Sequence, residues 1–102
     1  MDDATLATLK NQHGMVFRYT IDGQTLLFRR AKRADYRRFK TEAMDDKRRA
    51  LATENLAAAC LLQPDADTYE ALLERYPAVP ERVASDILDD IMQVEAVQKK
   101  IS

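Results

Sequence analysis

The spacing of apolar residues predicts a short helix near the start of the chain. Leu6 and Leu9 stand three positions apart among mostly polar residues, and this spacing places both side chains on one face of a helix. Gly14 follows, and glycine is the residue that most often ends a helix. The pattern therefore predicts a helix over residues 3–12.

The next segment alternates in the way that is typical of a strand. Phe17, Tyr19 and Ile21 occupy every second position, which matches the period of two of a half-buried strand. Asp22-Gly23 follows, and this dipeptide favours a type I′ turn because both of its positions tolerate a positive φ. The sequence predicts a β-hairpin over residues 15–29. Because an isolated hairpin is marginally stable in water, we expect helices to cover one of its faces.

Helical spacing continues through the rest of the chain. Asp45-Asp46 stand where they can cap a helix that ends before Pro64, and Asp67 begins a pattern similar to a capping box. Pro80 suits the first turn of a last helix. The predicted helices cover residues 33–44, 47–63, 67–76 and 80–98.

Together these elements predict an α+β fold in a single domain of residues 1–102. It consists of an N-terminal helix, a two-stranded β-hairpin, and about four helices packed as a small bundle over residues 33–98. Hydrophobic residues make up 46% of the chain and charged residues 32%, a composition typical of a chain that folds. No apolar run approaches the roughly 20 residues of a membrane span, so we expect no membrane partner. A single cysteine and the acidic start favour a cytoplasmic protein.

The net charge of −1 conceals an uneven distribution of charge along the chain. Residues 29–49 carry ten basic and four acidic side chains, a balance of +6, whereas residues 50–102 carry four basic and ten acidic ones, a balance of −6. These two regions can attract each other within one fold, meet across two molecules, or face different partners.

A basic patch in the middle of the chain is a candidate nucleic-acid surface. Its side chains would line a phosphate backbone, and Tyr36 or Phe39 would stack on bases. The overall pI of about 5.8 argues against binding to a polyanion. The helical spacing of Tyr36 and Phe39 places them in the core rather than on the surface. We therefore expect no nucleic-acid partner. The patch consists of Arg29, Arg30, Lys32, Arg33, Arg37 and Arg38.

No group of residues matches a catalytic or cofactor-binding motif. His13, the single histidine, is expected to be structural or exposed, and Cys60 lies in an apolar segment where burial disfavours the thiolate. Asp86, Asp89 and Asp90 are interpreted as a solvated helix face rather than a cation site. The two glycines fit neither the dinucleotide-binding fingerprint nor the P-loop. We expect no enzymatic activity, metal, cofactor or small-molecule substrate.

The order of several segments resembles the small tail assembly chaperones of long-tailed bacteriophages and prophages. The resemblance extends over about residues 5–92, and its motifs are structural rather than catalytic. Members of that family often have Pro-Thr, with the threonine as a helix cap, where Ala31-Lys32 stand here. The segments that carry the resemblance are KNQHG at residues 10–14, IDGQ at 21–24, FRRAKRADYRRF at 28–39, LAAACLLQPD at 56–65 and ALLERYP at 71–77.

The resemblance implies a non-enzymatic protein of the host cell cytoplasm that is absent from the mature virion. Such a protein binds the long, helical tape-measure protein and keeps it soluble until the tail tube polymerises around it. In many relatives, translational frameshifting yields a longer form with an added C-terminal domain. The alternatives are a prophage-encoded adaptor or inhibitor of a host protein and, less favoured, a nucleic-acid-binding regulator.

The apolar stripe of the last helix is the candidate partner-binding surface. Its residues are Ile87, Ile91 and Val94, and Val97 and Ile101 continue it toward the end of the chain. A shared apolar stripe also favours a weak homo-oligomer. The alternative is that these side chains only pack against the hairpin or fray. If substitutions there leave the mass and the client binding unchanged, the exposed face of the hairpin around Arg18 and Thr20 is the next candidate.

Overall fold

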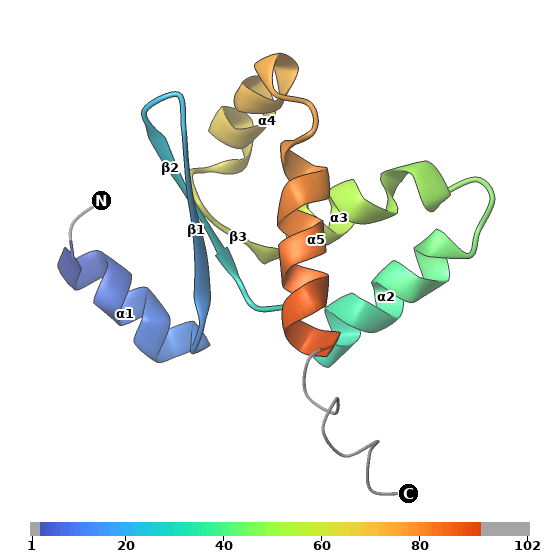
Figure 1. Ribbon diagram of the computed structural model, residues 1–102, viewed down its shortest axis with the longest axis horizontal. Helices are drawn as coiled ribbons and strands as arrows, with labels where there is room; N and C mark the ends of the chain where they lie inside the picture. The colour runs from blue at the N-terminus through green and yellow to red at the C-terminus, as the bar shows by residue number, and fades with distance from the viewer. Residues whose placement is uncertain (1–2, 93–102) are drawn as a thin grey trace, which may run out of the picture.

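The computed structural model describes residues 3–92 and has the predicted α+β architecture (Figure 1). Helix α1 and the hairpin come first, and the remaining helices follow, with α1 on one side of the hairpin and α2, α3 and α5 on the other. The elements are α1 (Asp3–His13), β1 (Val16–Ile21), β2 (Gln24–Arg29), α2 (Arg33–Ala43), a 3₁₀ turn (Arg49–Leu51), α3 (Ala52–Cys60), β3 (Leu61–Gln63), α4 (Ala66–Arg75) and α5 (Val79–Met92).

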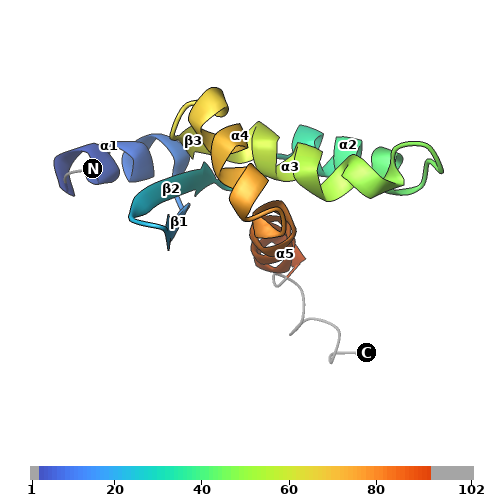
Figure 2. The ribbon, with the colours of Figure 1, turned by 90° about the horizontal axis from the view of Figure 1, so that it is seen from above.

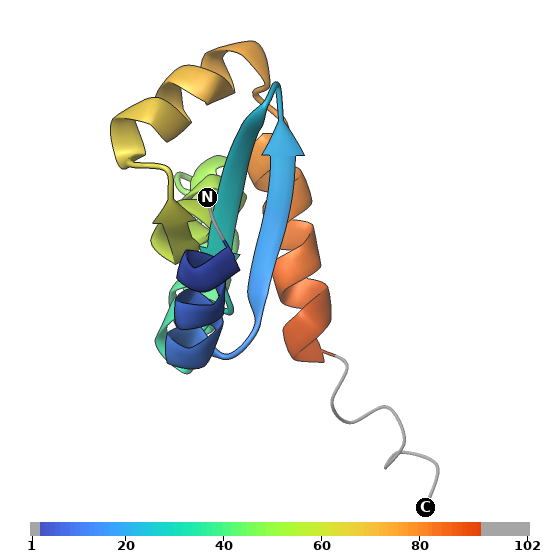
Figure 3. The same cartoon turned by 90° about the vertical axis from the view of Figure 1, so that its left-hand side faces the viewer.

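The predicted hairpin is present, with the turn at the expected dipeptide. Strands β1 and β2 pair antiparallel from Val16 opposite Arg29 to Ile21 opposite Gln24. Asp22 and Gly23 both have positive φ, 54° and 78°, as a type I′ turn requires. Figure 3 shows the two strands side by side, with α1 in front of them and α5 behind.

A third strand, which the sequence did not predict, completes the sheet. The helix expected to reach Gln63 ends at Cys60, and Leu61–Gln63 pairs antiparallel with β2. The strand order is therefore β1-β2-β3. Pro64 favours an extended conformation for the residue before it, and the free edge of β2 supplies hydrogen-bonding partners for that extended backbone. The two-stranded sheet of the prediction is thus a three-stranded one.

Two predicted helix starts are also corrected. The carbonyl of Asp45 accepts from Arg48 and Arg49 and its side chain accepts from Lys47, so residues 45–49 form turns and α3 begins only at Ala52. At α4 the cap is Asp65, whose carboxylate accepts from the backbone N–H of Thr68 at 3.1 Å. A cap must precede the helix, and Asp67 already lies within it.

The hydrophobic core lies between β2 and the helices that follow it. Phe28 stands at its centre, with the rings of Tyr19 and Tyr69 edge-on to it at centroid distances of 5.8 Å. Leu27 points to the opposite face of the strand and is also fully buried, so both faces of β2 are covered. The other buried members of the core are Leu26, Leu56, Ala57, Cys60, Leu72, Val83, Ala84 and Ile87.

Helices α3 and α5 cross each other rather than lying parallel (Figure 2). Viewed from above, α5 is seen nearly along its axis while α3 lies across the view (Figure 2). Helix α3 contacts both α5 and α2, so it links the two helices that flank it. This arrangement leaves the C-terminal half of α5 beside the start of α2, where the candidate site lies.

Candidate protein-binding groove

A buried ion pair fixes the start of α2. The Arg29 guanidinium donates from Nη1 to Oδ2 of Asp35 at 2.7 Å, and from Nη2 to the carbonyl oxygen of Ala59 at 2.8 Å. Asp35 is 7% exposed and also accepts from the backbone N–H of Lys32 at 2.8 Å. The hydrogen bonds from Arg29 hold the pKa of the Asp35 carboxyl below its usual range and outweigh the opposing effect of burial. Lys32 occupies the N-cap position, but its side chain has no hydrogen-bond acceptor. The Asp35 carboxylate instead accepts from a backbone N–H at the start of α2.

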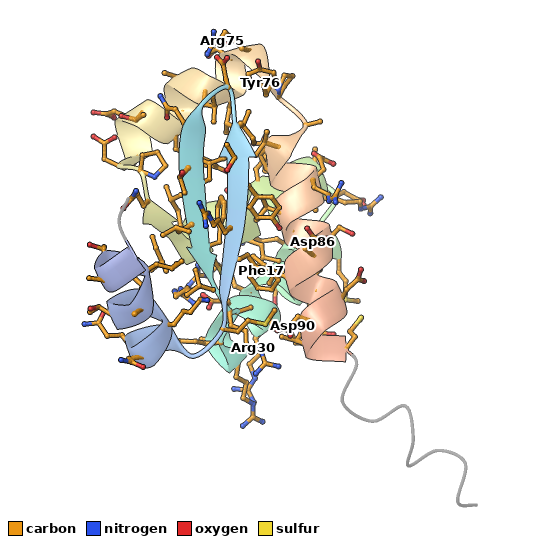
Figure 4. The ribbon with its side chains drawn as sticks, turned by 60° about the vertical axis from the view of Figure 1, so that its left-hand side comes forward. Phe17, Arg30, Arg75, Tyr76, Asp86 and Asp90 are labelled. Atoms are coloured by element: carbon orange, nitrogen blue, oxygen red, sulfur yellow. The ribbon has the colours of Figure 1, made fainter. Side chains whose placement is uncertain are left out.

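A second group of polar contacts joins the sheet and the β2–α2 connection to α5. Arg30 pairs with Asp90, and the two side chains point toward each other near the end of α5 (Figure 4). The Tyr19 hydroxyl donates to Asp86 at 2.7 Å, and Arg82 donates to the same carboxylate at 3.3 Å. Burial, followed by the bond to Asp86, raises the pKa of Tyr19. The Arg30–Asp90 pair thus holds the basic segment against α5, and the Tyr19–Asp86 bond holds β1 against it.

A hollow of about 320 Å³ opens where the basic segment meets the end of α5. Ile91 is half-buried there and Met92 is 64% exposed. This hollow brings together three members of the predicted basic patch, Arg30, Lys32 and Arg33, and one predicted partner-binding residue, Ile91, about 60 positions later in the sequence. Its lining residues are Arg30, Ala31, Lys32, Arg33, Tyr36, Ile91 and Met92.

A second hollow of about 380 Å³ continues the first one along α2 and α5. The two hollows share Tyr36 and Met92, and we refer to them together as the α2–α5 groove. The floor is apolar, whereas the first hollow carries basic side chains and the second carries Glu81 and Asp89. The groove therefore has one basic and one acidic end. The second hollow is lined by Tyr36, Phe39, Thr53, Glu81, Ser85, Leu88, Asp89 and Met92.

The other predicted partner-binding residues are placed differently. Ile87 is fully buried and belongs to the core rather than to a surface. Val94, Val97 and Ile101 lie outside the described residues. Of the predicted stripe, Ile91 is therefore the member that the structure places in the groove.

The basic patch is divided between internal contacts and the surface. The Arg29 side chain is 17% exposed and held by Asp35, and Arg30 is held by Asp90. The other members are exposed, and within residues 3–92 none of them forms an ion pair with a carboxylate. These exposed members are Lys32, Arg33, Arg37 and Arg38.

Cys60, Asp86 and Asp90, which the sequence analysis considered for chemistry, are buried or paired within the fold. Cys60 is fully buried, and burial raises the pKa of its thiol to about 11, as expected for a core cysteine. Asp86 and Asp90 are engaged by Tyr19 and Arg30. Within residues 3–92, no group of three or more His, Cys, Asp or Glu side chains is arranged to hold a metal ion.

Sequence reasoning overlooked two features of this site. Tyr36 and Phe39 were interpreted as core residues from their helical spacing. Phe39 does pack against the core, but both side chains are only half-buried and also line the groove. Met92 was not singled out at all. No local sequence signal marks the groove, because its walls come from segments of α2 and α5 that are about 50 positions apart.

Comparison with known proteins places the chain in a family. Residues 9–100 match the family described as Domain of unknown function (DUF6848). The chain belongs to this family. No curated protein matches the sequence. Among the described helices, none is both long enough and apolar enough to cross a membrane.

A solved structure supports the fold independently. The uncharacterised protein RBSTP2171 from Bacillus stearothermophilus is similar to this DUF6848 chain, with a TM-score of 0.69 and 24% sequence identity. The match covers 89% of this chain and 95% of the other. At this identity the similarity concerns the fold alone.

Proposed function

We propose that this DUF6848 protein is a bacteriophage tail assembly chaperone. It binds the tape-measure protein in the cytoplasm of the host cell and keeps it soluble during tail tube assembly, and it is absent from the mature virion. The order of sequence motifs over about residues 5–92 supports this reading. The structural observation that carries it is the α2–α5 groove, which has the chemistry that a helical client requires.

An amphipathic helix is recognised by a groove with an apolar floor and polar edges. Tyr36, Phe39, Leu88 and Met92 supply apolar surface in the α2–α5 groove. The exposed methionine suits a client whose sequence varies along its length, because methionine is flexible and polarizable and adapts to different side chains.

The charges of the groove also favour one orientation of a bound helix. A helix carries partial positive charge at its N-terminus and partial negative charge at its C-terminus. The client helix would therefore place its N-terminus near Glu81 and its C-terminus near Lys32 and Arg33.

Co-expression with the tape-measure protein of the same genome tests the proposal. We expect the tape-measure protein to move from the pellet to the supernatant when this chain is present. Met92→Glu should return it to the pellet, because a carboxylate in the apolar floor must be desolvated when the client binds. The side chain is 64% exposed in the free protein, so this substitution should leave the melting temperature almost unchanged.

Met44→Glu is the matched control. Met44 is 83% exposed and lies at the end of α2, outside the lining of the groove. The Met44→Glu variant should solubilise the client as well as the wild-type chain does. A client that is equally insoluble with and without this protein, or a genome without a tape-measure protein, would refute the proposal. Equal loss of client solubility with Met92→Glu and Met44→Glu would show that the groove is not the client-binding site.

A further inference from the structure

A separate hollow of about 260 Å³ lies between α3 and α4. It shares no lining residue with the α2–α5 groove. Its volume is below the roughly 300–1,000 Å³ typical of small-molecule sites, which suits one side chain rather than a whole ligand. The lining residues are Glu54, Asn55, Ala58, Tyr69, Glu70, Leu73, Glu74 and Pro77.

The hollow carries negative charge that the described part of the chain does not balance. None of Glu54, Glu70 and Glu74 forms an ion pair with any cation among residues 3–92. The amide of Asn55 does not compensate for them, because it donates to Glu42 at 3.3 Å. Ala58, Leu73 and Pro77 supply the apolar part of the wall.

The Tyr69 hydroxyl is an unpartnered polar group at this hollow. Tyr69 is 2% exposed, and its hydroxyl oxygen is buried without a hydrogen-bond partner. A buried polar group in this condition costs free energy, so native proteins rarely leave one without a role. Burial, together with the nearby charges of Glu70 and Glu54, raises the pKa of the hydroxyl to about 12. It therefore keeps its proton at neutral pH, and its oxygen can accept a hydrogen bond.

We propose that this hollow receives the guanidinium of an arginine side chain from a partner protein. The planar guanidinium has five donors and no acceptor, so it can donate to carboxylates on two helices at once, and a small shift of the Tyr69 side chain would add its buried oxygen as an acceptor. A compact point charge fits less well, because the described carboxylates do not converge as metal ligands do. The apolar wall accommodates the methylene stem of the arginine.

This inference goes beyond the proposed function and does not depend on it. The groove accommodates an apolar helix face, whereas the α3–α4 hollow selects one charged side chain. The site can be tested on the isolated protein without any tape-measure protein, so the two proposals can fail separately.

The test is a titration of the ¹⁵N-labelled full chain with N-acetyl-arginine amide, followed by NMR. We expect saturable shifts confined to the backbone amides of residues 54–58 and 69–74. The neutral isostere N-acetyl-citrulline amide should produce none of them, and N-acetyl-lysine amide should bind more weakly. Equal shifts with the citrulline compound, or no saturable shift at tens of millimolar arginine compound, would overturn the proposal.

Tyr69→Phe separates a binding role from a structural one. It should weaken arginine binding at least fivefold while leaving the melting temperature equal or higher, because it removes an unsatisfied buried hydroxyl. A structural hydroxyl would instead lower the melting temperature. Unchanged affinity in Tyr69→Phe contradicts the proposal.

A charge series provides the second variant and its control. The double substitution Glu70→Gln with Glu74→Gln should weaken binding at least tenfold. Asp67→Asn, on the same helix but outside the hollow, should leave it unchanged. Equal loss in the double variant and in Asp67→Asn would indicate general electrostatic attraction and would overturn a specific site.

Discussion

Asp35 illustrates how one side chain connects three elements. Its carboxylate accepts from Arg29 at the end of β2 and from the backbone of Lys32 at the start of α2, while Arg29 also donates to Ala59 at the end of α3. Arg29 was grouped with the exposed basic patch in the sequence because its neighbours are basic. Its actual role depends on Ala59, 30 positions away, which local sequence cannot reveal.

We expect Asp35→Asn to lower the free energy of unfolding by about 3 kcal/mol, because it leaves a largely buried guanidinium without its counter-charge. Asp46→Asn is the matched control. Its partner Arg49 is 62% exposed and Asp46 itself is 92% exposed, so the loss should stay within about 0.5 kcal/mol. Urea denaturation at pH 7 measures both. Equal losses in the two variants would contradict the structural role of Asp35.

The pH dependence of stability provides a second check of the same residue. The pKa of Asp35 is lower in the folded than in the unfolded chain, so its contribution is complete above the unfolded value of about 3.9. It is lost as the pH falls below that value toward the folded pKa. The stability difference between wild type and Asp35→Asn should therefore be constant from pH 7 to pH 5 and shrink below about pH 4. A difference that is as large at pH 3 as at pH 5 would contradict this assignment.

At the scale of elements, local patterns predicted most of the fold. The hairpin and the helices around Tyr36, Leu72 and Val83 follow from spacing and turn residues that interact over a few positions. Strand β3 does not, because the apolar run before Pro64 has no period and its partner strand lies more than 30 positions earlier.

The turn of the hairpin permits a direct test of backbone conformation. Gly23 has a φ of 78°, and a Cβ added there would meet no atom within 4 Å. Gly23→Ala should therefore cost about 1–2 kcal/mol through backbone strain alone. Gly23→Asn should cost clearly less, because asparagine tolerates this conformation. Thermal melts compare the two variants, and equal losses would contradict the left-handed assignment.

At the scale of the whole molecule, the basic region of residues 29–49 and the acidic region of residues 50–102 meet within one fold. Arg30 from the basic region pairs with Asp90 from the acidic region (Figure 4). This contact realises the first of the three arrangements that the charge distribution allowed. The groove depends on the same approach of distant segments, so no local motif marked it. Weak self-association stays a prediction.

We expect no salt-sensitive binding of DNA or RNA at micromolar protein. Four of the ten basic side chains in residues 29–49 are paired with described carboxylates, and the net charge of the chain is −1. Fluorescence anisotropy at about 50 and 200 mM salt tests this, since phosphate contacts weaken steeply over that range. Salt-dependent binding that disappears on changing Arg33, Arg37 and Arg38 to alanine would favour a nucleic-acid-binding regulator.

The central position of β2 has a consequence for synthesis on the ribosome. Phe28 pairs with Leu61, which is added 33 positions later, so at roughly 5–20 residues per second the strand waits about 2–7 s for its second neighbour. The core residues of α5 follow later still. During this interval the newly made hairpin presents an apolar face and an open strand edge to the cytosol, which is the kind of surface that nascent-chain chaperones bind. A protein that we propose as a chaperone thus has a brief need for one during its own synthesis.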